Sequence, residues 1–216
     1  MVTDSSLDAH LDAPLDAAPE SAKRKQILDG ARRVFLASGF DAASMGEIAR
    51  EAKVSKGTLY VYFDSKEALF AALIEESKRA TAERLVVLDP DNPDVAQVLT
   101  AHAVSLMEKL AEPDHVAMVR MVIGAAEKFP ALAQIFYEAG PALGRRRLTA
   151  YLEAQHARGR LVVRDPEIAA WQLLGMCCHP ITVHVVLADQ LLPDPARIRT
   201  YAEAAVATFL AAYAAP

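Results

Sequence analysis

The stretch that decides the fold is SMGEIAREAKVSKGTLYVYF, residues 44–63 of a chain of 216 residues. Ser44, followed three residues later by Glu47, has the pattern of a capping box, which begins a helix by satisfying its first backbone N–H groups. Ser55 offers a second N-cap, for a short helix over residues 56–62. Two short helices joined by a tight turn are typical of a helix-turn-helix.

The side chains around the turn fit this interpretation. Val54 is expected to lie beneath the turn, and Ala49 is small enough for the two helices to cross closely. Leu59 and Phe63, four residues apart, share one helical face and are expected to pack into the core. The side chains left to point outward are those of Lys56, Thr58, Tyr60 and Tyr62.

The rest of the chain predicts further helices, so the expected fold class is all-α. Apolar residues make up 53% of the sequence and recur at spacings of three and four, whereas long alternating runs of Val, Ile and Thr are missing. Gly39 ends the first helix, and proline or glycine separates the later ones. The expected helices outside the decisive stretch cover residues 24–38, 65–88, 94–111, 114–128, 131–139, 142–158, 166–189 and 195–213.

Charge is distributed unevenly along the chain. The formal net charge is -5, yet residues 23–66 carry nine basic and five acidic side chains, a local net charge of +4. Residues 1–22 carry five acidic side chains and no lysine or arginine. Because local charge governs attraction to phosphate, the sequence predicts a basic DNA-binding part between an acidic tail and an acidic body.

The acidic tail, residues 1–22, repeats Leu-Asp-Ala three times. Pro14 and Pro19 argue against a stable helix there, so we expect a disordered, solvated tail. The alternative is a tail that competes with DNA for the basic part of the chain.

Composition also excludes several classes of protein. No apolar segment reaches the roughly 20 residues that a membrane span needs, and the acidic start lacks the cationic region of a secretory signal. The two cysteines, Cys177 and Cys178, are adjacent, which makes a poor structural disulfide, and two thiols alone do not form a zinc site. We therefore expect a cytoplasmic protein with no membrane partner, metal or cofactor, and we leave open a redox switch at either thiol.

On the helix-turn-helix and its flanks, the sequence resembles the TetR family of bacterial transcriptional regulators. The matching residues are Ile27-Leu28, Ala31, Phe35, Gly39-Phe40, Ser44-Met45, Ile48-Ala49, Ala52, Val54-Ser55, Gly57-Thr58-Leu59-Tyr60, Tyr62-Phe63, Lys66 and Leu69. One departure is Lys53, where the family usually has glycine. A left-handed conformation at this lysine would cost about 1 kcal/mol.

The resemblance implies a three-helix DNA-binding domain over residues 23–69. It implies that Ser44 and Lys66 contact phosphates, with plain N-capping and a solvated lysine as the alternatives. The two tyrosines are expected to reach the DNA backbone unless they pack, half-buried, on neighbouring helices. The predicted DNA-binding residues are Ser44, Ser55, Lys56, Gly57, Thr58, Tyr60, Tyr62 and Lys66.

Physical chemistry supports two of these assignments independently. Lys56 and Lys66 lie in the first turns of their helices, where a cation opposes the helix dipole unless an external anion is bound. Lys56, Gly57 and Thr58 are also the best candidates for base contacts. A lysine can donate to guanine, a threonine methyl can meet a thymine methyl, and glycine permits close approach.

The C-terminal part, residues 70–216, loosely resembles the C-terminal region of AefR-type repressors, at Phe129-Pro130, Phe136-Tyr137, Gly140-Pro141 and residues 157–161. The resemblance implies a helical domain that binds a small effector and forms the dimer. Methionine adapts to varied apolar ligands, although a methionine or aromatic residue at helical spacing more often belongs to the plain core. The candidate effector-binding residues are Met107, Met118, Met121, Phe136, Trp171, Met176 and His179.

His179 has three interpretations: a core residue, a polar pocket group or, beside the cysteines, a metal ligand. Its spacing matches no strong metal motif, so we predict no metal site. Pro180, within the same expected helix, is interpreted as a kink that makes room for a ligand.

The last two expected helices are apolar on much of their surface and predict a homodimer. A two-fold four-helix bundle would bury them, whereas the alternative is the core of a monomer. A dimer would also place paired recognition helices about 34–36 Å apart, one groove repeat. The residues concerned are Leu173, Leu174, Val183, Val186, Ala204, Ala205, Ala207, Phe209, Leu210, Ala211 and Ala212.

Together these observations predict a dimeric repressor that binds a near-palindromic operator in double-stranded DNA. A small, largely apolar effector would release it by favouring a state with the wrong spacing of recognition helices. An activator, or a DNA-binding protein controlled by another protein, stays open as an alternative. A third alternative is an all-α enzyme, but no nucleophile, base and orienting group are visible together, so we do not expect an enzyme.

Overall fold

The computed structural model describes residues 17–183 and 194–215, apart from the side chains of residues 17–21 and 78–84. This part of the chain forms ten helices, and no helix in it is long and apolar enough to span a bilayer. The helices are α1 (Ala17–Ala42), α2 (Met45–Glu51), α3 (Lys56–Tyr62), α4 (Lys66–Arg84), α5 (Val95–Ala111), α6 (Pro113–Ala125), α7 (Pro130–Ala139), α8 (Pro141–Ala157), α9 (Pro166–Ile181) and α10 (Pro195–Tyr213).

Local sequence signals explain where many helices begin. Five helices start after a serine or aspartate whose side chain accepts a hydrogen bond from the backbone N–H three residues on. Helices α6 to α10 also begin with proline, which has no N–H to leave unpaired. The five N-caps are Ser44, Ser55, Asp94, Asp165 and Asp194.

The predicted bounds of two helices were wrong. Helix α1 begins at Ala17 rather than at residue 24, so residues 17–22 of the expected tail are helical. Pro19 lies in the first turn of α1, where proline is tolerated. Helix α4 ends at Arg84 rather than at residue 88, because two valines and the residue before Pro90 disfavour helix. The rest of the predicted tail, residues 1–16, lies outside the described residues.

The glycine predicted to end the first helix does so. Gly39 has φ 76° and ψ 164°, which breaks the regular helix within α1. A β-carbon is unfavourable at such a positive φ, so glycine suits this position. The chain then turns through Phe40 toward α2.

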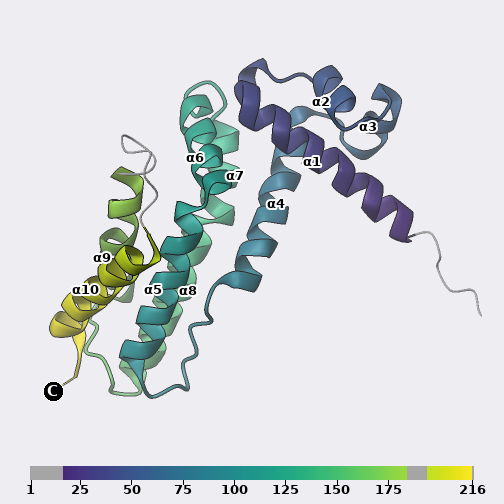
Figure 1. The fold of residues 1–216 in the computed structure, drawn as a ribbon. Helices are drawn as coiled ribbons and strands as arrows, with labels where there is room; N and C mark the ends of the chain where they lie inside the picture. Colours follow the sequence, from purple (N-terminus) through teal and green to yellow (C-terminus); the bar gives the residue numbers. More distant parts are fainter. Residues whose placement is uncertain (1–16, 184–193, 216) are drawn as a thin grey trace, which may run out of the picture.

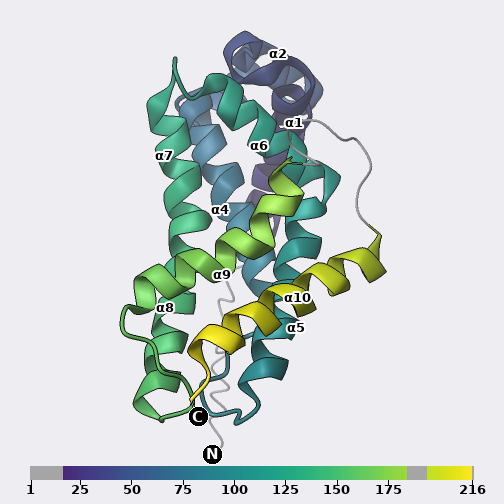
Figure 2. The ribbon, with the colours of Figure 1, turned by 90° about the vertical axis from the view of Figure 1, so that its left-hand side faces the viewer.

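The buried side chains form two clusters, and each cluster joins helices that are not all consecutive in the sequence. One cluster of buried side chains, here called the upper core, joins α1–α4 to α6 and α7. The other, the lower core, joins α5, α8, α9 and α10. Figure 1 shows α1–α3 at one end of the molecule, with α4 running down from them. Figure 2 shows α9 and α10 lying across α5 and α8.

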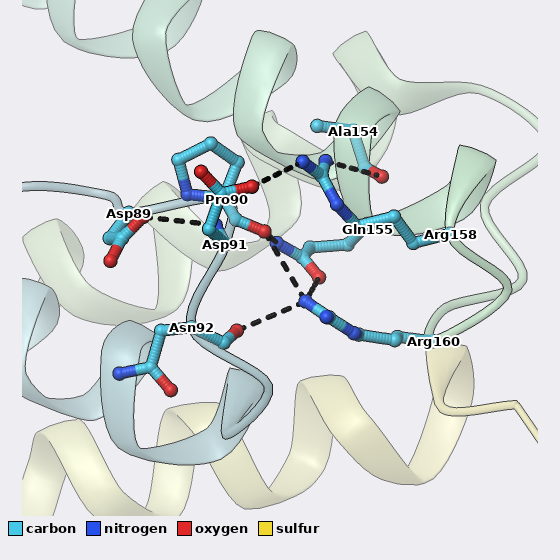
Figure 3. Close-up of polar contacts among 8 residues, drawn as sticks. All are labelled: Asp89, Pro90, Asp91, Asn92, Ala154, Gln155, Arg158 and Arg160. Atoms are coloured by element: carbon cyan, nitrogen blue, oxygen red, sulfur yellow. Dashed lines mark hydrogen bonds and ion pairs between the residues drawn. The ribbon is translucent and has the colours of Figure 1, made fainter.

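A polar clamp fixes the segment between α4 and α5 to the end of α8 (Figure 3). Gln155, which is fully buried, donates its amide N–H to the Pro90 carbonyl oxygen at 3.0 Å. Arg160 donates to the carbonyl oxygens of Pro90 and Asn92, at 3.2 and 3.1 Å, and to the Gln155 side chain. Gly159, with φ 69°, turns the chain so that Arg160 can reach back. The clamp thus gives a structural role to Gly159 and Arg160, which lie in the segment 157–161 that resembles AefR-type repressors.

Candidate nucleic-acid interface

The turn between α2 and α3 has the geometry that the sequence predicts. Lys53 has φ 53°, a left-handed conformation. Its N–H donates to the Arg50 carbonyl at 3.1 Å, and the Val54 N–H donates to the Ala49 carbonyl at 2.9 Å. This pair of bonds is the Schellman motif, in which glycine normally occupies the left-handed position. Lysine therefore holds this position at a cost of about 1 kcal/mol.

Helix α1 holds the helix-turn-helix through an unusually close contact. A β-carbon added to Gly30 would lie 2.7 Å from the Ala52 β-carbon and 2.8 Å from the Ala52 backbone nitrogen. One turn earlier, Gln26 donates its amide N–H to the Ala52 carbonyl oxygen at 2.7 Å. The predicted small residue, Ala49, is buried, but the closest approach lies at Gly30. These contacts fix the angle at which α2 and α3 leave α1.

Helix α3 is anchored by the side chains predicted to face the core. Leu59 is fully buried, Phe63 is 6% exposed, and Val54 packs against the upper core beneath the turn. The Arg24 guanidinium lies over the Phe63 ring, 5.4 Å from its centroid, which covers the end of α3. The anchored side of α3 is therefore fixed, and its other side is available.

The exposed side of α3 differs in part from the prediction. Lys56 and Gly57 are exposed and Tyr60 is 50% exposed, as expected. Tyr62, however, is half-buried and packs against the upper core, which is the alternative that the sequence left open for this tyrosine. Val61 is 83% exposed and was missed by the sequence analysis. Helical spacing could have found it, because Gly57 and Val61 lie opposite the buried pair on α3.

Ser55 and Thr58 are bonded to each other. The Ser55 hydroxyl accepts from the Thr58 N–H at 3.0 Å, and the two hydroxyl oxygens are 2.8 Å apart. Ser55 is exposed and Thr58 is half-buried. Their mutual bonding orders the N-terminal turn of α3.

Ser44 and Lys56 lie close together at the start of α2. The Ser44 hydroxyl accepts from the Glu47 N–H at 3.2 Å, and the Glu47 carboxylate accepts from the Ser44 N–H at 3.1 Å, which completes the predicted capping box. The Lys56 side chain runs over Gly46, with its Nζ 3.3 Å from where a β-carbon on Gly46 would sit. An exposed hydroxyl and an ammonium group are thereby brought to one place.

The Lys66 side chain is bonded within the protein, which neither the predicted phosphate contact nor a solvated lysine had anticipated. Its ammonium group donates to the carbonyl oxygens of Phe40, Asp41 and Ala43, at 2.9, 3.0 and 3.2 Å. An ammonium has three N–H donors, so all of them are used within the protein. The phosphate contact that the resemblance implied for Lys66 does not fit this geometry, because the group has no donor left for an external anion.

Comparison with known proteins places the chain in a family. Residues 27–73 match the family of bacterial regulatory proteins of the tetR type. Residues 97–215 match the C-terminal domain of AefR-like transcriptional repressors. The chain belongs to the TetR family. It is thus a transcriptional regulator, of a family whose members bind DNA operators and dimerise.

Individual TetR-family relatives agree with this assignment. The flavonoid-responsive regulator FrrA is 35% identical, with a TM-score of 0.79 over 90% of this chain and 98% of that one. A TetR-family regulator from Mesorhizobium loti has the same TM-score and coverage at 26% identity. The uncharacterized HTH-type transcriptional regulator YdeS of Bacillus subtilis is 34% identical over 53% of this chain and 55% of its own. The chain spans between 22% and 55% of the length of the first curated relatives that it matches.

The seven candidate effector-binding residues are not brought together in this TetR-family fold. Met107 is fully buried in the lower core, and Met176 packs against the same cluster. Met118, Met121 and Phe136 belong to the upper core. The remaining two face outward: Trp171 is 50% exposed and His179 is exposed. Residue type does not show which of two cores a helix faces, and which of the seven candidates contact an effector stays a prediction.

The cysteines beside His179 are free thiols in the described structure. Burial raises the pKa of Cys177 to about 12 and that of Cys178 to about 11, so both stay protonated near neutral pH. A protonated thiol is a poor nucleophile, which disfavours the redox switch. Among the described residues, no cluster of three or more His, Cys, Asp or Glu side chains could hold a metal ion.

The outer faces of α9 and α10 carry uncovered apolar and small side chains. On α9, Ile168 is 53% exposed and Trp171 is 50% exposed, with Gly175 one turn further along the same face. The bulky Leu173 and Phe209, expected to need a partner, are instead buried within their own chain, as is Ala205. The exposed alanines of α10 are Ala204, Ala207, Ala211 and Ala212. Val186, also predicted to lie at the interface, is outside the described residues.

Proposed function

We propose that this TetR-family regulator is a dimeric repressor whose α3 enters the major groove of its operator. The observation that carries the proposal is the outer face of α3, where Lys56, Gly57, Tyr60 and Val61 are exposed at one end of the molecule. A helix of seven residues is roughly 10 Å long, which suits a major groove about 12 Å wide.

Each exposed residue has a role in this proposal. The Val61 side chain is apolar and 83% exposed, which suits contact with a thymine methyl. Gly57 allows the backbone to approach a base edge. Tyr60 reaches the DNA backbone through its hydroxyl. Lys56 contacts a phosphate beside Gly46 through its exposed ammonium group. Ser44 joins this contact by turning its O–H, which donates to the Glu47 carboxylate at 3.0 Å, toward the same phosphate.

Helices α9 and α10 form the dimer in this proposal. Their exposed alanines and Gly175 allow two helices to approach closely, and Trp171 supplies the large apolar side chain typical of interfaces. The Arg145 guanidinium, over the Trp171 ring at 5.2 Å, holds that ring in place. A two-fold pair would present two copies of α3 to an operator with near-palindromic half-sites.

The effector in this proposal is small and largely apolar and carries a hydrogen-bonding group. The Tyr151 hydroxyl supports this, since it is buried in the lower core and has no hydrogen-bond partner among the described residues. Burial raises the pKa of Tyr151 to about 12, so the phenol stays a donor. The relative FrrA is named for its response to a flavonoid. Aromatic compounds with hydroxyl groups are therefore the first class to test.

Selection from random-sequence duplexes, followed by anisotropy titration across a salt series, tests the DNA-binding part. We expect specific binding with a steep negative dependence on salt. Tyr60→Ala should weaken binding by roughly two- to twelvefold, since one hydrogen bond contributes about 0.5–1.5 kcal/mol. Tyr137→Ala, which also removes an exposed tyrosine but from α7, serves as the matched control and should bind as the wild type does. Equal affinities for the two variants would contradict the proposed role of α3.

Thermal unfolding with and without candidate compounds tests the effector. A set of flavonoids should raise the unfolding temperature and release bound DNA, whereas Tyr151→Phe should reduce both effects. Release of DNA by straight-chain fatty acids but by no aromatic compound would contradict the proposed class.

A further inference from the structure

Lys66 joins the start of α4 to the end of α1, beyond Gly39, and to the residue that follows α1. Its ammonium group donates to the carbonyls of Phe40 and Asp41, in the last turn of α1, and to the carbonyl of Ala43. Ala43 directly precedes Ser44, the N-cap of α2. Three hydrogen bonds from one charged group thus connect α4 to the backbone that leads into α2, in addition to the packing of both helices in the upper core.

The same ammonium group also contacts the turn between α6 and α7. Its Nζ lies 4.6 Å from the centroid of the Phe40 ring and 5.6 Å from that of Phe129. The two rings contact each other edge to face, with centroids 5.1 Å apart. In Figure 1 this turn lies beside the C-terminal end of α1. Cation–π contacts of this kind add to the three hydrogen bonds.

An ion pair continues the contact at the surface. Lys128, next to Phe129, pairs with the Asp41 carboxylate at 2.5 Å. Both side chains are more than half exposed, so salt screens this pair, and the partly buried Lys66 carries most of the connection.

Lys56 offers a contrast within the same domain. Lys56 is exposed and has no hydrogen-bond partner in the described part of the chain, whereas the donors of Lys66 are fully used. Both lysines lie in the first turn of a helix, where a cation opposes the helix dipole, so the local sequence signal is the same for both.

We propose that Lys66 is a positioning residue for DNA binding and does not contact a phosphate. It holds Ser44 and the start of α2 in place, and through Phe129 it makes this placement depend on the turn between α6 and α7. The inference rests on the proposed DNA-binding function and names the residue that links its DNA-binding helices to the body of the protein.

The salt dependence of DNA binding separates positioning from phosphate contact. Each phosphate contact contributes about 0.9 to the slope of log affinity against log salt concentration. Lys66→Met keeps the apolar stem against the aromatic rings and removes the charge. We expect it to lower affinity for the selected duplex at least about tenfold with the slope unchanged, because three charged hydrogen bonds are lost. Lys56→Met is the matched control and should make the slope shallower by about 0.9.

Further variants separate positioning from a merely structural role. Circular dichroism selects conditions in which each variant is fully folded, so that a loss of affinity reflects the folded protein. Lys66→Arg should restore affinity to within about threefold, because a guanidinium can also donate to several carbonyls. Phe129→Leu should lower affinity with an unchanged slope, and its effect should shrink when it is combined with Lys66→Met, since both act through one contact.

Amide hydrogen exchange over residues 44–51 provides a readout that needs no DNA. Exchange there should be at least about tenfold faster in Lys66→Met and unchanged in Lys56→Met. Wild-type binding in the same series tests the proposed function separately. A shallower slope for Lys66→Met, wild-type affinity for the folded variant, or unchanged exchange over residues 44–51 would each overturn the inference.

Discussion

The close contact between α1 and the end of α2 makes Gly30→Ala a sharp test of the fold. The added methyl would meet the Ala52 β-carbon at 2.7 Å and its backbone at 2.8 Å, whereas carbon atoms prefer about 3.5–4.0 Å. Because backbone atoms cannot rotate away as the end of a side chain can, α1 and α2 would have to separate by roughly 1 Å. Separation would also stretch the bond from Gln26 to the Ala52 carbonyl, now 2.7 Å.

The magnitude follows from three contributions. Overpacking costs about 1–3 kcal/mol, and the weakened hydrogen bond costs about 1 kcal/mol. The better helix propensity of alanine offsets about 1 kcal/mol of this loss of stability. We therefore expect Gly30→Ala to lower the free energy of unfolding by about 1–3 kcal/mol, measured by urea unfolding at fixed protein concentration.

Gly144→Ala is the matched control for this substitution. Gly144 lies within α8, and a β-carbon there would meet nothing within 4 Å. The same chemical change should then stabilise the protein by about 0.5–1 kcal/mol. If Gly30→Ala stabilises the protein as much as Gly144→Ala does, the close contact between α1 and α2 is not present, and the reasoning fails.

Three further predictions concern stability. Burial, with nearby Lys109, lowers the pKa of His115 to about 4, so this residue contributes stability above pH 6.5 that is lost as the pH falls toward 4. The loss is at most about 3 kcal/mol. Urea unfolding across this pH range should show a shallower loss of stability for His115→Gln than for the wild type, and an unchanged profile would refute the assignment. Lys53→Gly should raise the free energy of unfolding by about 1 kcal/mol because glycine adopts the left-handed conformation without strain, and a destabilised variant would count against the turn geometry. Gln155→Leu should cost about 2–3 kcal/mol in urea unfolding because it strips partners from Arg160 and Pro90, and a neutral effect would show that the clamp is not needed.

Much of the DNA-binding part could be predicted because its signals are local. A capping box, a turn with a left-handed residue and two buried residues four apart are each written within a few positions, and Ser44, Lys53, Leu59 and Phe63 behave as predicted. Helix bounds were less certain at the start of α1, which begins at Ala17 rather than at residue 24.

What could not be predicted depends on contacts between distant parts of the chain. Lys66 carries the same local signal as Lys56, and only the fold shows that carbonyl oxygens take up its donors. Met107 and Met118 look alike in sequence, yet they lie in different cores. Their positions follow from which helices pack together, and residue type alone does not carry this information.

The upper core determines which helices would have to be kept together in a chimera of two related proteins. Val122 and Leu132, on α6 and α7, pack in the same cluster as Phe35 and Phe70 of the N-terminal helices. A chimera that joins the first four helices of one relative to the remainder of another would set two unmatched surfaces against each other. Successful recombination would have to transfer α6 and α7 together with α1–α4, although α5 separates them along the chain.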